Sequence, residues 1–431
     1  ENWVVVKVMA FGMNHSEALF RKFEIDNDYF EKVEIAGPGF INFYLKKDVL
    51  YNELLCILSE QNVYGKLPSN DKSVDVEYVS ANPTGPLHIG NARGGAIGDV
   101  LANAYAFAGY NVTKEFYLND AGNQIEKFGE SLDARLCQLN DPDYPFPEDG
   151  YMGDDIKDLV NNYLSDFGDS IFSEDKERRM KELISYSLDK NITNMKKVLD
   201  KYGVTYDVWF SESVLHNDGS IKNAIDLLAS KGATYEEDGA LWFKAKDYDC
   251  EKDEVLIRKN GIPTYYAADI AYHLNKLVER NFDLAVNVWG ADHHGHVHRL
   301  KMALAAAGVD PERLQVILMQ LVHLVKGGQT TRMSKRRGDM VTLDELIEDV
   351  STDSARFIFN QTTPNSHLDF DLDLAKQMYT KDLIFVEGNN DDISSTKIRK
   401  AIRDKDEKTI NELMCEEMVT YIKNNQIFEQ N

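Results

Sequence analysis

The order of apolar and polar positions predicts parallel α/β structure in the middle of the chain. VDVEYVS, residues 74–80, is an apolar-rich run of strand length, and NVTKEFYLND, residues 111–120, reads as a second strand. Between them, apolar residues recur at helical spacing from Ile89 to Ala108. Strand, helix and strand in succession favour a parallel βαβ unit with a right-handed crossover.

The strand rhythm is interrupted once and then resumes. Residues 124–254 are acidic and helical in pattern, with a two-strand patch around GATYEEDGALWFKAK, which indicates an insertion between two halves of a sheet. The rhythm returns with TYYAADIAYHLNKLVE, with DLAVNVWG leading into a helix near His293, and with LQVILMQL. A helical pattern then extends to about Phe359. Near the N-terminus, KVEIAGPGFINFYL predicts a strand pair broken by Gly37, Pro38 and Gly39.

Composition narrows the class of protein. A chain of 431 residues with 43% hydrophobic residues can build two or three domains. No apolar run approaches the roughly 20 residues of a membrane helix, and the first residues lack the features of a signal peptide. Four widely spaced cysteines without a CxxC pair suit a reducing cytoplasm. The net charge of -24 favours solubility and leaves room only for a local basic groove. We expect a cytoplasmic monomer without a membrane partner.

The segment SANPTGPLHIGN, residues 80–91, places a Pro/Gly loop between a strand end and a helix that begins near His88. A helix N-terminus offers unpaired N–H groups and partial positive charge, which suit a phosphate. Gly90 lacks a Cβ, so a flat base can approach the backbone there. A plain strand-to-helix turn with a surface histidine is the alternative for a lone HxG.

A second segment, RMSKR at residues 332–336, is basic and precedes a predicted helix. A solvated loop is the usual role of such a charge run. Alternatively, Lys335 on a mobile loop would stabilise the charge that develops on a departing pyrophosphate.

Two further strings, TYYAADIAYH (residues 264–273) and YLNDAGNQ (residues 117–124), supply the groups that a planar guanidinium needs. Asp269, Tyr265, Asn119 and Asp120 lie at predicted strand ends, where open α/β sheets bind ligands. For any one of them, helix capping or core packing is the alternative.

The string WGADHHGHVH holds four of the ten histidines. His294 and His298 have the i, i+4 spacing of two metal ligands, but no Glu or Cys lies nearby to complete a site, so we expect no metal there.

Taken in order, these strings resemble the motifs of class I aminoacyl-tRNA synthetases, and most closely the bacterial arginyl-tRNA synthetases. SANPTGPLHIGN is similar to the HIGH motif region and RMSKR to the KMSKS loop, and the resemblance extends over residues 32–375. It implies a Rossmann-like α/β fold divided into the following parts: a partial α+β N-terminal domain (1–70), the first half of the catalytic domain (71–123), a connective insertion (124–254), the second half with the RMSKR loop (255–345), a helical stem (346–378) and a tail (379–431).

The resemblance also implies an activity and its residues. The expected reaction is ATP-dependent activation of L-arginine, with Mg²⁺ accompanying ATP, followed by transfer to the acceptor end of tRNA(Arg). The implied catalytic residues are His88, Asn91 and Lys335. The implied ATP-binding residues are Pro86, His88, Gly90, Asn91, Gly290, Asp292, His293, His296, Met333, Ser334 and Lys335. The implied arginine-binding residues are Ser80, Asn82, Thr84, Asn119, Asp120, Tyr265 and Asp269.

The sequence departs from the family pattern at three places. Asn91 stands where the HIGH motif has its second histidine, and Arg332 stands where KMSKS has its first lysine, which predicts retuned activity. The family's helical anticodon-binding domain would begin near residue 376, but the tail from there resembles the end of nicotinate-nucleotide adenylyltransferases, with ISSTKIR at residues 393–399. Two alternatives therefore stay open: adenylyltransferase activity, and a non-catalytic synthetase fragment that binds arginine, ATP or RNA.

Overall fold

The computed structural model describes residues 29–36, 40–327, 329–331, 341–379, 400–402, 404, 406 and 408–410. The RMSKR segment, including Met333, Ser334 and Lys335, and the ISSTKIR segment of the tail lie outside the described residues. Predictions that concern those segments stay predictions.

A five-stranded parallel sheet forms the centre of the molecule, in the order β10-β9-β3-β4-β5. Its strands are β3 (Ser73–Glu77), β4 (Asn111–Leu118), β5 (Val208–Ser211), β9 (Leu284–Gly290) and β10 (Leu314–Met319). The chain leaves β3 on one side toward β4 and β5, and it returns on the other side to β9 and β10. The point where the order reverses lies between β3 and β9, where open α/β sheets bind ligands beyond the strands' carboxyl ends. The predicted Rossmann-like α/β class is confirmed.

Helix α3 (Ile89–Phe107) connects β3 to β4 as the predicted βαβ unit. Its small residues allow close contact with the sheet, because a Cβ at Gly98 would lie only 2.1 Å from Cγ of Tyr78. Ala92 and Ala96 are fully buried on the same helix. The helix that begins at the candidate phosphate site is therefore packed tightly onto the central strand.

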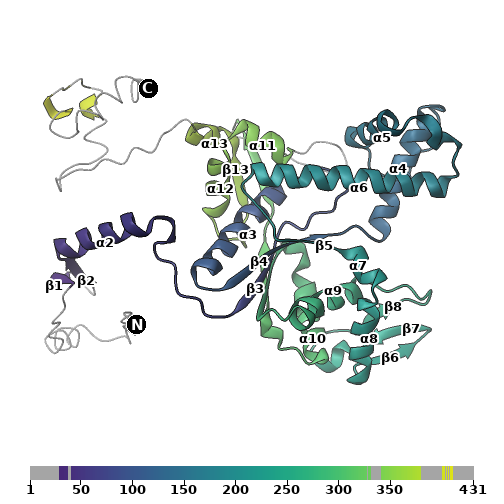
Figure 1. The fold of residues 1–431 in the computed structure, drawn as a ribbon, viewed down its shortest axis with the longest axis horizontal. Coiled ribbons are helices and arrows are strands. Elements are labelled where there is room, and N and C mark those ends of the chain that lie inside the picture. Colours follow the sequence, from purple (N-terminus) through teal and green to yellow (C-terminus); the bar gives the residue numbers. More distant parts are fainter. Residues whose placement is uncertain are drawn as a thin grey trace.

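The segment between β4 and β9 is more than an insertion. Helices α4 (Asn123–Gln138), α5 (Asp154–Phe167) and α6 (Lys176–Lys201) form a bundle with its own core beside the sheet (Figure 1). The sequence placed all of residues 124–254 in this insertion, yet β5 pairs with β4 and is an edge strand of the central sheet. The strand VWFS has only four residues, which is too short for a periodic pattern to reveal it.

A second small unit follows β5. It contains α7 (Glu212–Asn217), α8 (Ser220–Ser230), β6 (Thr234–Glu237), β7 (Ala240–Phe243) and β8 (Glu254–Ile257). The three strands form an antiparallel sheet, whereas the sequence predicted two strands. Its core is continuous with α9 (Tyr265–Leu274) and α10 (His294–Ala307), which flank β9 in the chain. A π-helical turn, Asn275–Glu279, extends α9.

The chain beyond β10 forms a third unit against α3. It contains β11 (Val322–Lys326), β12 (Gln329–Thr331), β13 (Leu368–Asp371), α11 (Leu343–Asp349), α12 (Thr352–Asn360) and α13 (Leu372–Tyr379). The helical pattern predicted to reach Phe359 is two helices, because Val350 and Ser351 are extended and the Ser351 side chain caps α12.

The N-terminal part of the described chain stands apart from the sheet (Figure 1). Strands β1 (Phe30–Ala36) and β2 (Phe40–Leu45) pair antiparallel, which confirms the predicted strand pair. Helix α2 (Lys47–Glu60) follows and buries none of its residues. Short 3-10 turns complete the structure at Gln61–Val63, Asp169–Ser173, Ala245–Tyr248, Ala291–His293 and Pro311–Arg313. Over the part of the chain that the structure describes, no helix is both long and apolar enough to cross a bilayer.

Candidate active site

His88 is the N-cap of α3, and its geometry follows from a reciprocal pair of hydrogen bonds. The Gly90 N–H donates to Nδ1 of His88 at 3.1 Å, and the His88 N–H donates to Oδ1 of Asn91 at 3.0 Å. This is a capping box in which a histidine and an asparagine replace the usual Ser/Thr and Glu/Gln. Because Nδ1 accepts a hydrogen bond, the neutral imidazole carries its proton on Nε2. Asn91 thus fixes the backbone at His88, and the Gly90 N–H holds the ring.

The chain that follows the RMSKR segment returns directly to this helix entry. The Ile89 N–H donates to the carbonyl of Val341 at 3.3 Å, and the Leu343 N–H donates to the carbonyl of Leu87 at 2.8 Å. Between them, His88 and Thr342 face each other in an isolated antiparallel bridge. A segment more than 250 positions away in the sequence therefore begins again within hydrogen-bonding distance of the first motif. The position of Lys335 itself stays a prediction.

Gly290 ends β9, the strand beside β3, at the same edge of the sheet. A Cβ at Gly290 would lie 2.5 Å from Oδ1 of Asp292, so only glycine leaves that side chain its present place. Asp292 and His293 follow on an exposed turn, with 3.8 Å between Oδ2 and Nε2. These three residues follow the carboxyl end of β9, as His88 and Gly90 follow the carboxyl end of β3. Their contact with the ribose and adenine stays a prediction.

Asp269 on α9 and His296 on α10 form a hydrogen-bonded pair that joins these two helices. Oδ2 of Asp269 lies 2.8 Å from Nε2 of His296. The His296 ring also contacts Trp289, with 5.9 Å between ring centroids. The sequence assigned His296 to the phosphates, and the structure places it against the carboxylate assigned to arginine. Tyr265 lies one turn before Asp269 and is half exposed.

The carboxylate of Glu212 lies within electrostatic reach of Asp269, and the sequence analysis did not identify it as a site residue. Glu212 begins α7 at the end of β5, is 2% exposed, and has no hydrogen-bond partner on Oε2. Burial, with smaller contributions from the carboxylates of Asp269 and Asp120, raises the pKa of Glu212 to about 7. A buried carboxylate held beside like charges is well suited to receive a cation. The signal was available in FSES after a strand end, but β5 was not recognised.

Some of the other predicted arginine contacts are engaged in hydrogen bonds within the protein, and others have buried atoms without a partner. The Asp120 carboxylate accepts hydrogen bonds from the Ser213 N–H at 2.9 Å and from the Ser211 hydroxyl, so it holds the start of α7 in place. Asn119 Oδ1 and Thr84 Oγ1 are buried without a hydrogen-bond partner. The Asn82 amide donates to Gln124. Pro86, a predicted ATP contact, is exposed in the loop before His88.

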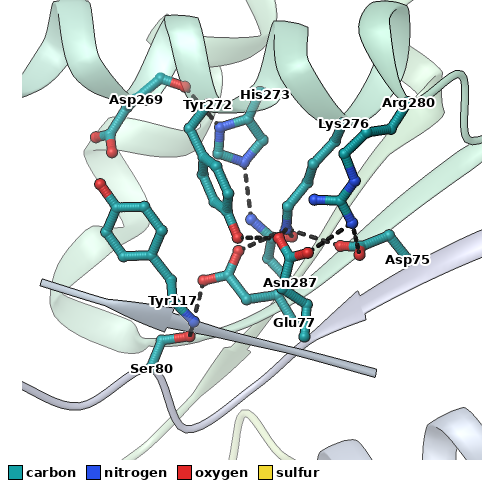
Figure 2. Close-up of polar contacts among 11 residues, drawn as sticks. Asp75, Glu77, Ser80, Tyr117, Asp269, Tyr272, His273, Lys276, Arg280 and Asn287 are labelled. Atoms are coloured by element: carbon teal, nitrogen blue, oxygen red, sulfur yellow. Dashed lines mark hydrogen bonds and ion pairs between the residues drawn. The ribbon is translucent and has the colours of Figure 1, made fainter. Parts of the chain in front are cut away.

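Ser80 connects the end of β3 to β4 through its own side chain. Its hydroxyl donates to Oε1 of Glu77 at 3.0 Å and accepts from the Tyr117 N–H at 3.1 Å (Figure 2). Val79 and Ser80 both have left-handed backbones, with φ of 70° and 39°. A β-branched residue rarely adopts this conformation, and such strain concentrates at functional sites. The hydroxyl predicted to contact arginine is thus engaged in shaping the loop.

Beneath the site lies a buried cluster of charges that the sequence analysis also missed. The Lys276 ammonium, fully buried, contacts Asp75 at 2.8 Å and Glu77 at 2.7 Å (Figure 2). Arg280 pairs with Asp75 at 3.1 Å and with Glu115 at 2.6 Å. Burial raises the pKa of Asp75 to about 6 against the opposing effect of Lys276. Three carboxylates and two cations therefore occupy the middle of the parallel sheet.

Within the described residues, no group of three or more His, Cys, Asp or Glu side chains is arranged to hold a metal ion. His298 Nε2 lies 2.9 Å from the backbone carbonyl of Asp249, which is a structural contact.

Comparison with known proteins shows which family the chain resembles. Residues 53–372 match the family described as tRNA synthetases class I (R), catalytic domain, and residues 16–45 match the arginyl tRNA synthetase N terminal domain. The chain is 55% identical over 371 residues to an arginine–tRNA ligase of Caldanaerobacter subterraneus subsp. tengcongensis, covering 86% of this chain and 66% of the relative. It is 53% identical over 363 residues to an arginine–tRNA ligase of Acetivibrio thermocellus, covering 84% of this chain and 64% of the relative. The chain thus spans about two thirds of the length of these curated relatives.

Solved structures agree with the sequence matches. A structure from Campylobacter jejuni described as an arginyl-tRNA synthetase superposes with a TM-score of 0.69 at 34% identity, covering 75% of this chain and 71% of that one. The Thermus thermophilus arginyl-tRNA synthetase superposes with a TM-score of 0.59 at 18% identity, covering 90% and 78%, and supports the fold alone. The family match over residues 53–372 and the identities to these relatives lead to one conclusion: the chain belongs to the arginyl family of class I aminoacyl-tRNA synthetases.

Proposed function

We propose that the chain activates L-arginine with ATP and transfers it to tRNA(Arg), as an arginine–tRNA ligase. The observation that carries this proposal is the Glu212 carboxylate, which is buried, unpartnered on one oxygen and within electrostatic reach of Asp269. Glu212 begins α7 after β5, and His88 begins α3 after β3, so both follow carboxyl ends of strands in one parallel sheet. One edge of one sheet thus offers a receptor for a cation and a receptor for an anion. Arginine and ATP carry those charges.

On the arginine side, the guanidinium is held by Glu212 and Asp269 and lies against the Tyr265 ring. A guanidinium presents five N–H donors in one plane, so it can satisfy two carboxylates at once. Its positive charge also replaces the proton that Glu212 would otherwise retain near neutral pH. Orphaned acceptors on Asn119 and Thr84 supply further hydrogen-bonding capacity in the same region.

On the nucleotide side, the N-terminus of α3 and the Nε2 proton of His88 bind the triphosphate. Gly90 gives the adenine access to the backbone, and Gly290, Asp292 and His293 border the ribose. Lys335 adds positive charge from the RMSKR segment. Mg²⁺ arrives with ATP as part of the substrate.

The chemical step is in-line attack of an arginine carboxylate oxygen on the α-phosphorus of ATP. A new O–P bond forms, the bond to the β-phosphate oxygen breaks, and pyrophosphate leaves with the electron pair. The protein contributes position and charge compensation, which carry most of the rate in phosphoryl and nucleotidyl transfer. The 2′-hydroxyl of the terminal tRNA adenosine then attacks the arginyl carbonyl and AMP leaves. We place this reaction in the cytoplasm, on a monomer.

The direct test is exchange of labelled pyrophosphate into ATP, measured with and without tRNA(Arg). Exchange that depends on arginine supports the proposal, and exchange with a different amino acid redirects the specificity. Glu212→Gln should abolish most of the arginine-dependent rate. Asp133→Asn is the matched control, because Asp133 is equally buried but pairs with Arg179 in the α4–α6 bundle. Absence of exchange under both conditions, in a folded protein that still binds arginine and ATP, would identify a non-catalytic binding fragment instead.

The nicotinate-nucleotide adenylyltransferase interpretation of the tail stays a separate prediction, since residues 393–399 lie outside the described residues. Incubation of the chain with nicotinate mononucleotide and ATP tests it directly. We expect no dinucleotide product, because the sequence offers no second strand-turn-helix motif for that reaction.

A further inference from the structure

Lys276 lies where two hydrogen-bond chains meet beneath the candidate arginine site. Its side chain is fully buried and comes from the π-helical turn that follows α9. Besides its ion pair with Asp75, the ammonium donates to Oε2 of Glu77 at 2.7 Å and to Oδ1 of Asn287 at 3.4 Å. These two acceptors belong to β3 and β9, the strands on either side of the switch point.

The first chain leads from Lys276 to the loop before the HIGH-like motif. Glu77 uses one oxygen for Lys276 and accepts from the Ser80 hydroxyl with the other, at 3.0 Å. Ser80 in turn accepts from the Tyr117 N–H at 3.1 Å. These bonds hold the strained turn at Val79 and Ser80, from which the loop carrying Asn82 and Thr84 departs.

The second chain leads from Lys276 to the backbone of Asp269. Asn287 accepts from Lys276 through Oδ1, so its Nδ2 donates to Nε2 of His273 at 2.8 Å. Nε2 is therefore an acceptor, and Nδ1 carries the ring proton and donates to the Asp269 carbonyl at 2.8 Å. Burial lowers the pKa of His273 to about 4, which keeps the ring neutral. Figure 2 shows this chain from Asp269 through His273 to Asn287 and Lys276.

We propose that Lys276 is a positioning residue for arginine recognition, which fixes the Ser80 turn and the Asp269 turn relative to each other through these two chains. The proposal rests on the proposed function, since it takes arginine as the ligand. Lys276 touches no substrate. It acts by making the loop from β3 and the helix α9 share one buried donor, so that neither can shift without breaking a buried hydrogen bond.

Arg280 provides a matched control within the same cluster. It pairs with Asp75 and Glu115, as Lys276 does, at 3.1 and 2.6 Å. Its side chain contacts Asp75, Glu115 and Phe282, and within the described part of the chain it makes no hydrogen bond to Ser80, Asn287 or His273. Removing either cation leaves the carboxylates undercompensated and costs stability, but only removal of Lys276 disconnects the two chains.

The experiment compares Lys276→Met with Arg280→Met in pyrophosphate exchange, measuring KM for arginine and KM for ATP separately. Lys276→Met should raise KM for arginine by roughly 10- to 100-fold and leave KM for ATP within about twofold, because a displacement of about 1 Å in a recognition group has that consequence. Arg280→Met should leave both constants within about threefold of the unmodified chain. Equal losses for arginine in the two variants would overturn the proposal.

Two further variants keep the test decisive if Lys276→Met does not fold. Asn287→Ala and Ser80→Ala each cut one chain while keeping the buried ammonium and its carboxylates. Each should raise KM for arginine without raising KM for ATP, and an unchanged KM for arginine in both would overturn the proposal.

Nitrogen-15 NMR of histidine-labelled protein gives an independent readout. His273 should carry its proton on Nδ1 in the unmodified chain and lose that preference in Asn287→Ala. A ring protonated on Nε2 in the unmodified chain would contradict the second hydrogen-bond chain. Absence of arginine-dependent exchange in the unmodified chain would instead count against the proposed function, and the tautomer measurement would still stand by itself.

Discussion

Thr342 faces His88 across an isolated antiparallel bridge, flanked by the hydrogen bonds Ile89 N–H to Val341 and Leu343 N–H to Leu87. This relationship places Val341 and Thr342 against the start of α3. Thr342 is itself the N-cap of α11, in a capping box with Glu345. Two helices thus begin beside each other, α3 after His88 and α11 after Thr342.

The capping box of α3 predicts a coupled effect on stability and nucleotide binding. Asn91→Ala should lower the free energy of unfolding by about 1 kcal/mol, because the His88 N–H loses its acceptor. It should also raise KM for ATP, because the backbone at His88, from which the ring projects, loses one of the two hydrogen bonds of the capping box. Asn91→Asp retains an acceptor oxygen and is the control for stability. Urea denaturation and pyrophosphate exchange measure the two effects, and a stable Asn91→Ala variant with unchanged KM would contradict the role given to the cap.

Glu212 predicts how arginine affinity depends on pH. Its pKa is raised to about 7 in the ligand-free protein, so the carboxylate is increasingly protonated below that pH and loses its attraction for the guanidinium. KM for arginine should therefore rise as pH falls from about 8 to 6, approaching tenfold per pH unit at the acid end. KM for ATP serves as the internal control over the same range. Glu212→Gln should bind arginine weakly at every pH, and a variant that keeps the original pH profile would exclude Glu212 as its source.

The contact between α3 and the central strand predicts a steric effect at Gly98. A methyl group there would lie 2.1 Å from Cγ of Tyr78, whose side chain is fully buried. Gly98→Ala should lower the free energy of unfolding by about 1–3 kcal/mol through overpacking. Gly295→Ala is the control, because Gly295 is also helical but has nothing within 4 Å of an added Cβ. Chemical denaturation should show that Gly98→Ala lowers the free energy of unfolding clearly more than Gly295→Ala does. Equal changes in the two variants would argue against this close approach.

Arg93 predicts that the third structural unit depends on one buried guanidinium. It is fully buried on α3 and donates to the carbonyls of Gln320, Ser366 and Thr363 at 2.9–3.1 Å. Lysine cannot reproduce this planar set of donors, so Arg93→Lys should cost about 1–3 kcal/mol of stability for the acceptors left unpaired. Because Gln320 directly follows β10 in the connection to β11, the variant should also raise KM for ATP more than KM for arginine. Equal stability of Arg93→Lys and the unmodified chain would contradict this assignment.

The parts of the site that lie close in sequence were predictable, and the parts assembled from distant strands were not. The start of α3 at His88 follows from a Pro/Gly loop followed by helical spacing, which is a local signal. Glu212 was missed because its strand has four residues and sits inside an acidic helical segment. Recognising it required knowing that β5 pairs with β4, which is a long-range fact.

The buried charge cluster was likewise not predictable from local sequence. Asp75 and Glu77 alternate with apolar residues in VDVEYVS, a pattern that also fits a strand with one solvated face. They are buried because Lys276 and Arg280, some 200 positions later, compensate their charge. No local feature of VDVEYVS indicates that Lys276 and Arg280 are its partners. The π-helical turn that directs Lys276 toward the sheet is likewise a consequence of tertiary packing.

The proposed mechanism requires that His88 and Lys335 reach the same triphosphate, and a double-mutant cycle tests this requirement most directly. ATP affinity is measured by calorimetry for the unmodified chain, His88→Ala, Lys335→Met and the double variant. Groups that hold the same ligand should show a coupling of about 0.5 kcal/mol or more. Additive losses, or no loss on removing Lys335, would mean that the two motifs serve different places on the molecule.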